Sequence, residues 1–209
     1  FVRYFTTLQL DRILKLKPFP SDLEAELRSD HAGEVGAVFI YKGANNAIQT
    51  LKKIKSVQSQ HISHMESFAT QHLATELKHL DIMNQLVSPS HRTKLVPVWK
   101  LCGWTLGFFP TLIFGSTGLY ATVNAVETFV EKHYGHQIML VDKLVKQNNL
   151  DNESLLELQN VLKQCCEDEV HHKEDAKSRL EGEIGFIGSL WKVIVEKGSG
   201  FAVKIAKRI

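Results

Sequence analysis

Apolar side chains recur every three or four residues along most of the chain, the spacing that places them on one face of an α-helix. This pattern predicts four long helices, at residues 22–48, 54–87, 117–147 and 152–180. It also predicts a turn at residues 148–151 and a last helix at 186–207, broken near Gly198 and Gly200. Almost no segment alternates apolar and polar residues as a strand does, so the sequence predicts an all-α fold.

Acidic side chains interrupt the apolar stripes of the four long helices. Their order along the chain is Glu34, then Glu76 with His79, then Glu127, then Glu169 with His172. A Glu and a His three residues apart share one face of a helix and can bind one metal ion. Four helices with one Glu each, and a His on two of them, form the ligand set by which a four-helix bundle binds two metal ions.

The donor types of this set favour iron or manganese over zinc, because four carboxylates and two imidazoles are hard and rich in oxygen. Two divalent cations would also offset four buried negative charges. The expected ligands of one metal are Glu34, Glu76 and His79, and those of the other are Glu127, Glu169 and His172, with two carboxylates bridging. The alternative is that both Glu-x-x-His pairs are surface pairs that arose by chance.

Residues around Glu34 have expected roles of their own. Asp30 lies one turn earlier and could accept a hydrogen bond from a ligand imidazole, with a plain surface Asp as the alternative. Gly33 and Gly36 flank Glu34 and lower the helix propensity, which suggests close backbone approach or space for a substrate.

Tyr134 lies two turns after Glu127 on the same helix face. It could relay an electron or orient a substrate, or it could simply pack in the core. His171 is expected to lie near the site or in solvent rather than to bind metal. The other histidines assigned to the surface are His61, His64, His72, His91 and His136.

Residues 96–116 form the most apolar part of the chain and contain Trp99 and Trp104. We expect an apolar hairpin here rather than a fourth bundle helix. Tryptophan at an apolar border is typical of segments at a membrane interface, although the hairpin could instead cap the bundle core. The helix at 186–207 is basic and amphipathic, a pattern suited to an anionic leaflet.

These two segments predict additional membrane-interface helices beside the bundle. No run of about 20 uncharged apolar residues occurs, so we expect a peripheral protein rather than a conventional membrane-spanning one. A dimetal site beneath such a surface could accept a molecule that lives in the lipid, such as a quinone with an isoprenoid tail.

Composition narrows the remaining possibilities. A net charge of +2 at pH 7 does not by itself indicate a nucleic-acid partner. Cys102, Cys165 and Cys166 form no Cys-x-x-Cys pair, which favours a reducing compartment. Residues 1–20 carry no acid before Asp11 and could be the end of a mitochondrial transit peptide or an ordinary N-terminus, followed by one domain at 21–209. No G-x-G-x-x-G motif follows a strand, so no nicotinamide-binding Rossmann fold is expected.

The chain resembles the 5-demethoxyubiquinone hydroxylase family of ubiquinone biosynthesis. The resemblance rests on Asp30-His-Ala-Gly-Glu34, the two Glu-x-x-His motifs, Ala125-Val-Glu127, His133-Tyr134 and Pro97-Val-Trp99. It implies a ferritin-like di-iron monooxygenase whose iron ligands are the six residues above, with Tyr134 near the metals. The spacing between Glu34 and Glu76 is longer than in the family, which suggests an insertion within residues 50–68, and Thr128 stands where many members have a second Glu.

The resemblance also implies a setting for the reaction. It implies a peripheral protein on the matrix side of the mitochondrial inner membrane, which uses O₂ and electrons from NADH delivered through the quinone. A lipid-binding partner from the same biosynthetic complex is expected, and a homo-oligomer is compatible with it. The competing hypotheses are a tRNA-hydroxylating di-iron enzyme, which would need a Lys/Arg-rich groove, and a non-catalytic iron-binding or scaffold protein.

Overall fold

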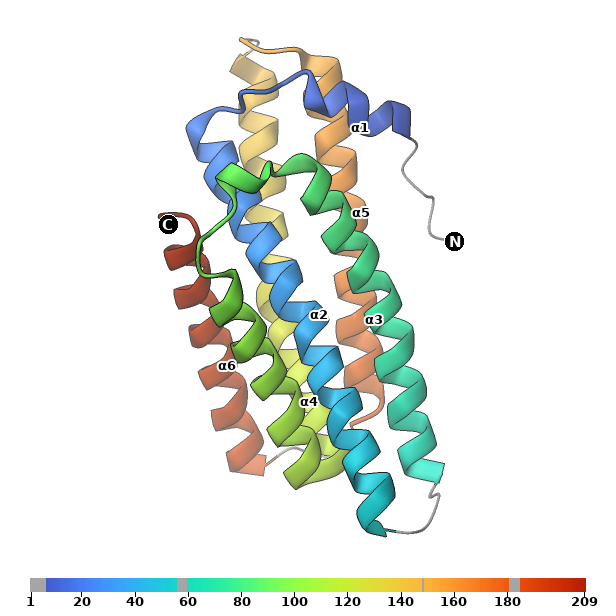
Figure 1. Ribbon diagram of the computed structural model, residues 1–209. Coiled ribbons are helices and arrows are strands. Elements are labelled where there is room, and N and C mark those ends of the chain that lie inside the picture. Colours follow the sequence, from blue (N-terminus) through green and yellow to red (C-terminus); the bar gives the residue numbers. More distant parts are fainter. Residues whose placement is uncertain (1–6, 56–59, 148, 181–184) are drawn as a thin grey trace.

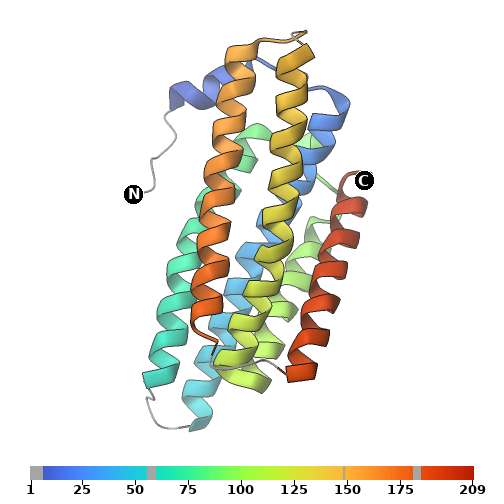
Figure 2. The ribbon, with the colours of Figure 1, turned by 180° about the vertical axis from the view of Figure 1, so that it is seen from behind.

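The computed structural model describes residues 7–55, 60–147, 149–180 and 185–209, and every regular element in these ranges is a helix (Figure 1). This confirms the predicted all-α fold. The elements are α1 (Thr7–Leu14), α2 (Ser21–Lys55), α3 (Gln60–Leu86), the 3₁₀ turn η1 (Pro89–His91), α4 (Val96–Gln147), α5 (Asn152–Ser178) and α6 (Gly185–Ala206). The long helices run side by side along one axis, as a ferritin-like bundle requires (Figures 1 and 2).

Helix α4 consists of two halves that meet at Gly115. That residue has φ 62° and ψ −135°, a conformation that glycine adopts without the steric cost of a Cβ. The first half, residues 96–114, runs down the bundle and the second half, residues 116–147, runs back up (Figure 1). Residues 96–116 therefore do not form a hairpin of their own as predicted: they supply one helical arm and the turn, and the second arm is the helix predicted at 117–147.

Four helices enclose the core of the bundle: α2, α3, the second half of α4, and α5. The first half of α4 lies against α2 with very close backbone approach. A Cβ at Gly103 would collide with the carbonyl of Gly36, and one at Gly107 would collide with the carbonyl of Ile40. Helix α6 packs beside this half and the second half of α4, where Val195 is buried against Ile40 and Val126. We call the first half of α4 together with α6 the outer layer.

Helix boundaries differ from the predictions at three places. Helix α2 extends to Lys55 rather than ending at residue 48, so the next helix, predicted from residue 54, begins at Gln60. The predicted break at Gly198 and Gly200 is wrong, because α6 is continuous through both. An interior glycine costs a helix only about 1 kcal/mol, and the packing of α6 against the bundle offsets that cost.

The packed part of the chain begins before residue 21. Helix α1 covers one end of the bundle, and Leu10, Ile13, Leu16 and Phe19 are buried in the same core cluster as α5. Arg12 on α1 also pairs with Glu153 on α5, with 2.6 Å between guanidinium and carboxylate. A transit-peptide remnant at residues 1–20 stays a prediction, and residues 1–6 lie outside the described ranges.

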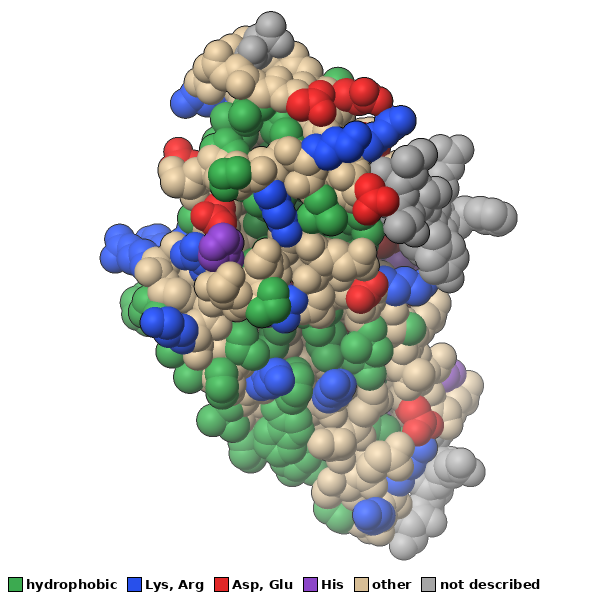
Figure 3. Space-filling view, turned by 45° about the horizontal axis from the view of Figure 1, so that its top comes forward, with side chains coloured by type: hydrophobic (Ala, Val, Ile, Leu, Met, Phe, Trp, Pro, Cys, Tyr) green, Lys and Arg blue, Asp and Glu red, His purple; other side chains and the backbone are tan. Residues whose placement is uncertain are grey.

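The outer layer exposes large apolar side chains. On α4 they include Leu101 (64% exposed), Ile113 (66%) and Phe114 (60%), and on α6 Phe201 (67%). Hydrophobic side chains gather over the lower part of the molecule, with Lys or Arg side chains among them (Figure 3). By length and mean hydropathy alone α4 could cross a membrane, but half of its apolar window is buried and Gly115 interrupts it. An exposed apolar surface of this kind is typical of an interaction or membrane site.

Candidate metal centre

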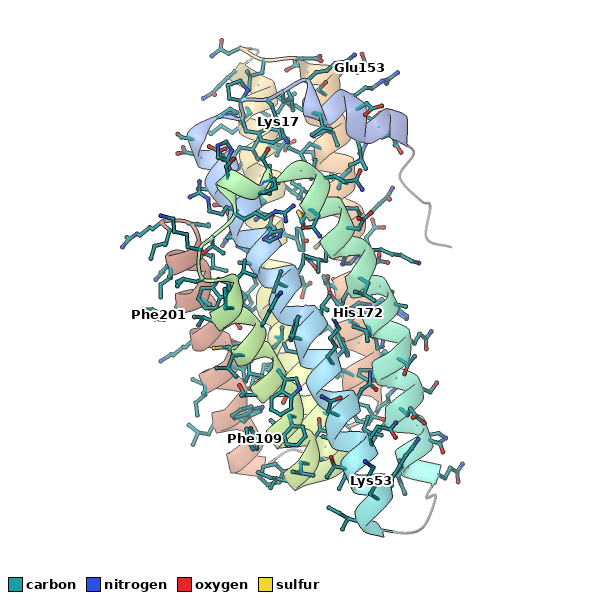
Figure 4. The ribbon with its side chains drawn as sticks, viewed as in Figure 1. Lys17, Lys53, Phe109, Glu153, His172 and Phe201 are labelled. Atoms are coloured by element: carbon teal, nitrogen blue, oxygen red, sulfur yellow. The ribbon has the colours of Figure 1, made fainter. Side chains whose placement is uncertain are left out.

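The six predicted ligands come together in the middle of the bundle. Glu34 comes from α2, Glu76 and His79 from α3, Glu127 from the second half of α4, and Glu169 and His172 from α5. All six residues are at most 4% exposed. His172 projects from α5 toward the bundle interior (Figure 4). Helical spacing explains the arrangement, because residues three apart on α3 and α5 point to the same side.

The ligand atoms form two overlapping groups, in each of which they lie within 4.8 Å of one another. One group contains Glu34, Glu76, His79 and Glu169, and the other contains Glu76, Glu127, Glu169 and His172. Glu76 and Glu169 belong to both groups. This is the arrangement expected if these two carboxylates bridge two metal ions and each ion has one terminal Glu and one His.

Both imidazoles turn Nδ1 toward the carboxylates. Nδ1 of His79 lies 2.9 Å from Oε1 of Glu169, and Nδ1 of His172 lies 3.1 Å from Oε2 of the same residue. On the other side of the first ring, Nε2 of His79 lies 3.1 Å from Oδ2 of Asp168. Because an ionised carboxylate only accepts, Asp168 can keep a hydrogen on Nε2 of His79 when Nδ1 gives up its own hydrogen and binds a metal.

Burial makes this cluster costly without a cation. Burial raises the pKa of Glu34, Glu76 and Glu127, and mutual repulsion with Glu169 adds to each rise. Burial opposes the charge of Glu169 too, but hydrogen bonds from His172 and His79 hold its pKa well below the usual range. The same carboxylates outweigh burial at His172 and raise its pKa to about 11.

The chemistry of the donors fits a hard divalent cation such as iron. Oε2 of Glu34 and Oε2 of Glu76 are buried and have no hydrogen-bond partner. Buried carboxylate oxygens are normally paired or bound to metal. Two such orphaned oxygens within a group of six donors therefore favour a two-metal site over the alternative of chance surface pairs.

A pocket of about 370 Å³ opens beside the cluster. It lies between α2, both halves of α4 and α6, and Glu34, Glu127 and Glu169 face it. Most of its other walls are apolar or glycine, and a Cβ at Gly33 would meet nothing within 4 Å. Open space beside Glu34 is therefore present at Gly33, and close backbone approach occurs at Gly36; occupation of that space by a substrate stays a prediction.

The sequence model of the ubiquinone biosynthesis protein COQ7 family matches residues 21–206, which is most of the chain. The chain belongs to the COQ7 family. This confirms the predicted family of ubiquinone biosynthesis.

Curated relatives from distant organisms are named as hydroxylases of demethoxyubiquinone or demethoxyubiquinol. The chain is 29% identical over 195 residues to the NADPH-dependent 3-demethoxyubiquinone 3-hydroxylase, mitochondrial, of Caenorhabditis elegans, covering 90% of each chain. It is 28% identical over 186 residues to the protein of that name from Mus musculus, covering 87% of this chain and 76% of the relative. A bacterial relative, the 3-demethoxyubiquinol 3-hydroxylase of Rhodospirillum rubrum, is 33% identical over 123 residues, 57% of this chain and 52% of its own.

Tyr134 and Asp30, two predicted neighbours of the metals in this COQ7 chain, have different surroundings. The hydroxyl of Tyr134 is buried and donates to Oε1 of Glu34 at 2.7 Å, so it touches a ligand carboxylate directly. Asp30 is buried as well, but its Oδ1 accepts from Gln137 at 2.5 Å and lies 3.1 Å from His133. The predicted bond from a ligand imidazole to Asp30 is wrong, because that position beside His79 is taken by Asp168.

His72 was assigned to the surface, and that assignment is wrong. It is 2% exposed, and its ring lies edge-on to that of His172 with 4.3 Å between the centroids. The signal that could have found it is position, since His72 lies four residues before Glu76 and so on the same face of α3. The other four histidines assigned to the surface are exposed, as expected: His61, His64, His91 and His136. His171 is exposed as well, which is one of its two expected places.

The three cysteines are free thiols. Cys165 lies four residues before Glu169, as His72 lies four residues before Glu76, and burial raises the pKa of its thiol to about 12. It therefore stays a neutral thiol beside the site.

Proposed function

We propose that this chain is a di-iron monooxygenase that hydroxylates the ring of demethoxyubiquinone or its quinol in ubiquinone biosynthesis. The observation that carries the proposal is the contact between a buried six-donor cluster and an apolar pocket. The names of the COQ7 relatives supply the substrate class. In the overall reaction one atom of O₂ enters a ring C–H bond and the other leaves as water, using two electrons and two protons.

The six residues at the centre would hold two iron ions, with Glu76 and Glu169 shared between them. When bound, the iron pair supplies the activation of O₂. The protein's own contribution is to exclude water around the carboxylates and to hold a proton beside them. Tyr134 is placed for the second task, because its hydroxyl donates to Glu34. A role for Tyr134 as an electron relay or in orienting the substrate remains part of the proposal.

The pocket offers the substrate ring a place beside Glu34 and Glu127. A second apolar groove of about 630 Å³ lies between the two helices of the outer layer. Both cavities are lined by Thr105 and Leu106, so they adjoin. We assign the ring to the first cavity and the isoprenoid tail to the second, which leads toward exposed side chains such as Ile113 and Phe114.

The outer layer would rest on the matrix face of the mitochondrial inner membrane. The names of the mouse and nematode relatives state that those proteins are mitochondrial. Exposed apolar residues and lysines on α4 and α6 suit a peripheral contact with an anionic leaflet. We further propose a lipid-binding partner of the same biosynthetic complex, with self-association also compatible. Electrons come from reduced nicotinamide, NADH or the NADPH named in the relatives, through the quinone.

A single-turnover reaction tests the hydroxylase. Iron-loaded, chemically reduced protein is mixed with a short-tailed demethoxyubiquinone under ¹⁸O₂, and the product is analysed by mass spectrometry. We expect one labelled oxygen in the ring. With two irons confirmed per chain, absence of hydroxylated product would favour the scaffold hypothesis instead.

A further inference from the structure

The two ligand imidazoles of the site have different supports. Asp168 contacts His79 directly through Nε2. Within the described residues, no carboxylate contacts the corresponding side of His172, whose Nδ1 lies 3.1 Å from Glu169 and 3.0 Å from Glu76. The ring of His72 packs against it instead, at an interplanar angle of 69°.

His72 is itself held in place from α5. Its Nε2 lies 2.9 Å from Oδ2 of Asp175, and since a carboxylate only accepts, Nε2 carries the hydrogen. Asp175 stands three residues after His172, one turn further along the same helix. His72 therefore contacts two successive turns of α5, one through its ring and one through its nitrogen.

Two further groups fix this arrangement. Nε of Arg179 donates to Oδ1 of Asp175 at 2.7 Å, which holds the carboxylate on the side of His72. The ring of Phe68, one turn before His72 on α3, lies edge-on to it at 4.4 Å between centroids. An apolar side chain would fill this space without the desolvation cost of a buried imidazole. The hydrogen bonds from Arg179 to Asp175 and from His72 to Asp175 therefore hold the His72 ring in one orientation, which an apolar side chain that only filled the space would not need.

We propose that His72 is a positioning residue for the metal ligand His172, anchored by Asp175 and Arg179. The inference rests on the proposed iron site. By filling the space beside the imidazole, His72 keeps Nδ1 of His172 directed at Glu76 and Glu169. The two metals therefore have unlike supports: a direct carboxylate for His79, and a packed and anchored ring for His172. Groups that orient metal ligands typically change metal affinity by 10- to 100-fold when removed.

Anaerobic Fe(II) binding, with ⁵⁷Fe Mössbauer spectra of the diferrous protein, tests the proposal without requiring turnover. His72→Ala is expected to weaken one of the two irons about 10- to 100-fold and to change one of two quadrupole doublets. Asp175→Ala, which keeps the His72 ring, should weaken the same iron less. Asp175→Asn, which still offers an oxygen acceptor, should restore most of the affinity.

Met65→Ala is the matched control, because Met65 is buried on the same helix in the core cluster that contains Phe68 and is not among the ligands. It should lower stability and leave both irons bound. Wild-type iron affinity and spectra in both His72→Ala and Asp175→Ala would overturn the proposal, as would equal iron loss in Met65→Ala. If the wild type binds no iron, both this inference and the hydroxylase fail. If it binds two irons without hydroxylating, only the hydroxylase fails.

Discussion

The four-helix core and the outer layer of this molecule differ in which side chains they bury and which they expose. The core buries the cluster of four glutamates and two histidines, and buried carboxylate oxygens such as Oε2 of Glu34 and Oε2 of Glu76 have no hydrogen-bond partner. The outer layer buries no comparable charge and exposes residues such as Leu101 and Phe201. The two parts meet where α2 contacts the first half of α4 through glycines. In the proposed function, the core helices therefore provide the oxygen chemistry, and the outer layer gives access to a lipid-borne substrate.

Removal of a shared ligand should have the largest effect. Glu169→Ala takes a carboxylate from both ligand groups, so iron affinity and hydroxylation should each fall more than about 100-fold. Iron content and single-turnover product yield measure the loss. Glu167→Ala, an exposed acid two residues earlier, is the control and should keep both values. An active Glu169→Ala protein would show that hydroxylation does not depend on the ligand cluster in the core.

A methyl group added where the first half of α4 contacts α2 should lower the stability of the protein. In Gly107→Ala the new methyl group meets the carbonyl of Ile40, and we expect a loss of about 1–3 kcal/mol in the free energy of unfolding. Urea unfolding at one pH measures it. A methyl group at Gly135, within the second half of α4, meets nothing within 4 Å, so Gly135→Ala should not destabilise the protein. Equal stabilities of the two variants would argue against close packing of α2 on α4.

A charge on the outer layer should separate membrane binding from the iron site. Ile113→Glu replaces a side chain that is 66% exposed, and vesicle binding should fall about 10-fold or more because about 1.5–3 kcal/mol of apolar transfer is lost. Sedimentation with vesicles that contain anionic lipid measures it. Met139→Glu, also on an exposed apolar residue of α4 but in the half that belongs to the core, should bind normally. Iron content should be unchanged in both, and a loss in Met139→Glu alone would place the membrane elsewhere.

A methyl group inside the pocket should affect substrate more than fold. Gly33→Ala adds a Cβ that meets nothing within 4 Å but narrows the space beside Glu34. We expect KM for a short-tailed quinone to rise about 5-fold, since one methyl group is worth roughly 1 kcal/mol or more in a pocket. Stability should rise slightly because alanine favours the helix by about 1 kcal/mol. An unchanged KM would mean that the ring binds away from Gly33.

The smallest expected effect is a pH dependence within the core. Burial and the nearby Arg92 lower the pKa of His31, whose Nε2 lies 3.2 Å from Oδ1 of Asn84. The unfolded chain then binds the proton at a higher pH than the folded one. Stability should fall as pH drops below about 6.5, by at most about 1.4 kcal/mol per pH unit. Urea unfolding of metal-free wild type and His31→Asn should show a flatter dependence in the variant; parallel curves would exclude His31 as the source.

The sequence could predict what depends on spacing along one helix. The Glu-x-x-His pairs place Glu76 with His79 and Glu169 with His172 on single faces, and the apolar pattern orients those faces inward. It could not predict which groups meet across the bundle. Asp168 rather than Asp30 contacts His79, and the buried His72 contacts Asp175. Both contacts depend on how α3 packs against α5.

The sequence also could not predict which glycines interrupt a helix. Gly115 reverses the chain, whereas Gly198 and Gly200 lie within a continuous helix. All three have the same intrinsic freedom, and the surrounding packing decides how it is used.

Diffraction at the iron absorption edge, from crystals of the iron-loaded protein, would locate the metal ions themselves. We expect two anomalous peaks per chain inside the bundle, with Glu76 and Glu169 between them, His79 on one iron and His172 on the other. A folded, iron-soaked chain with no peak within the six-residue cluster would contradict it.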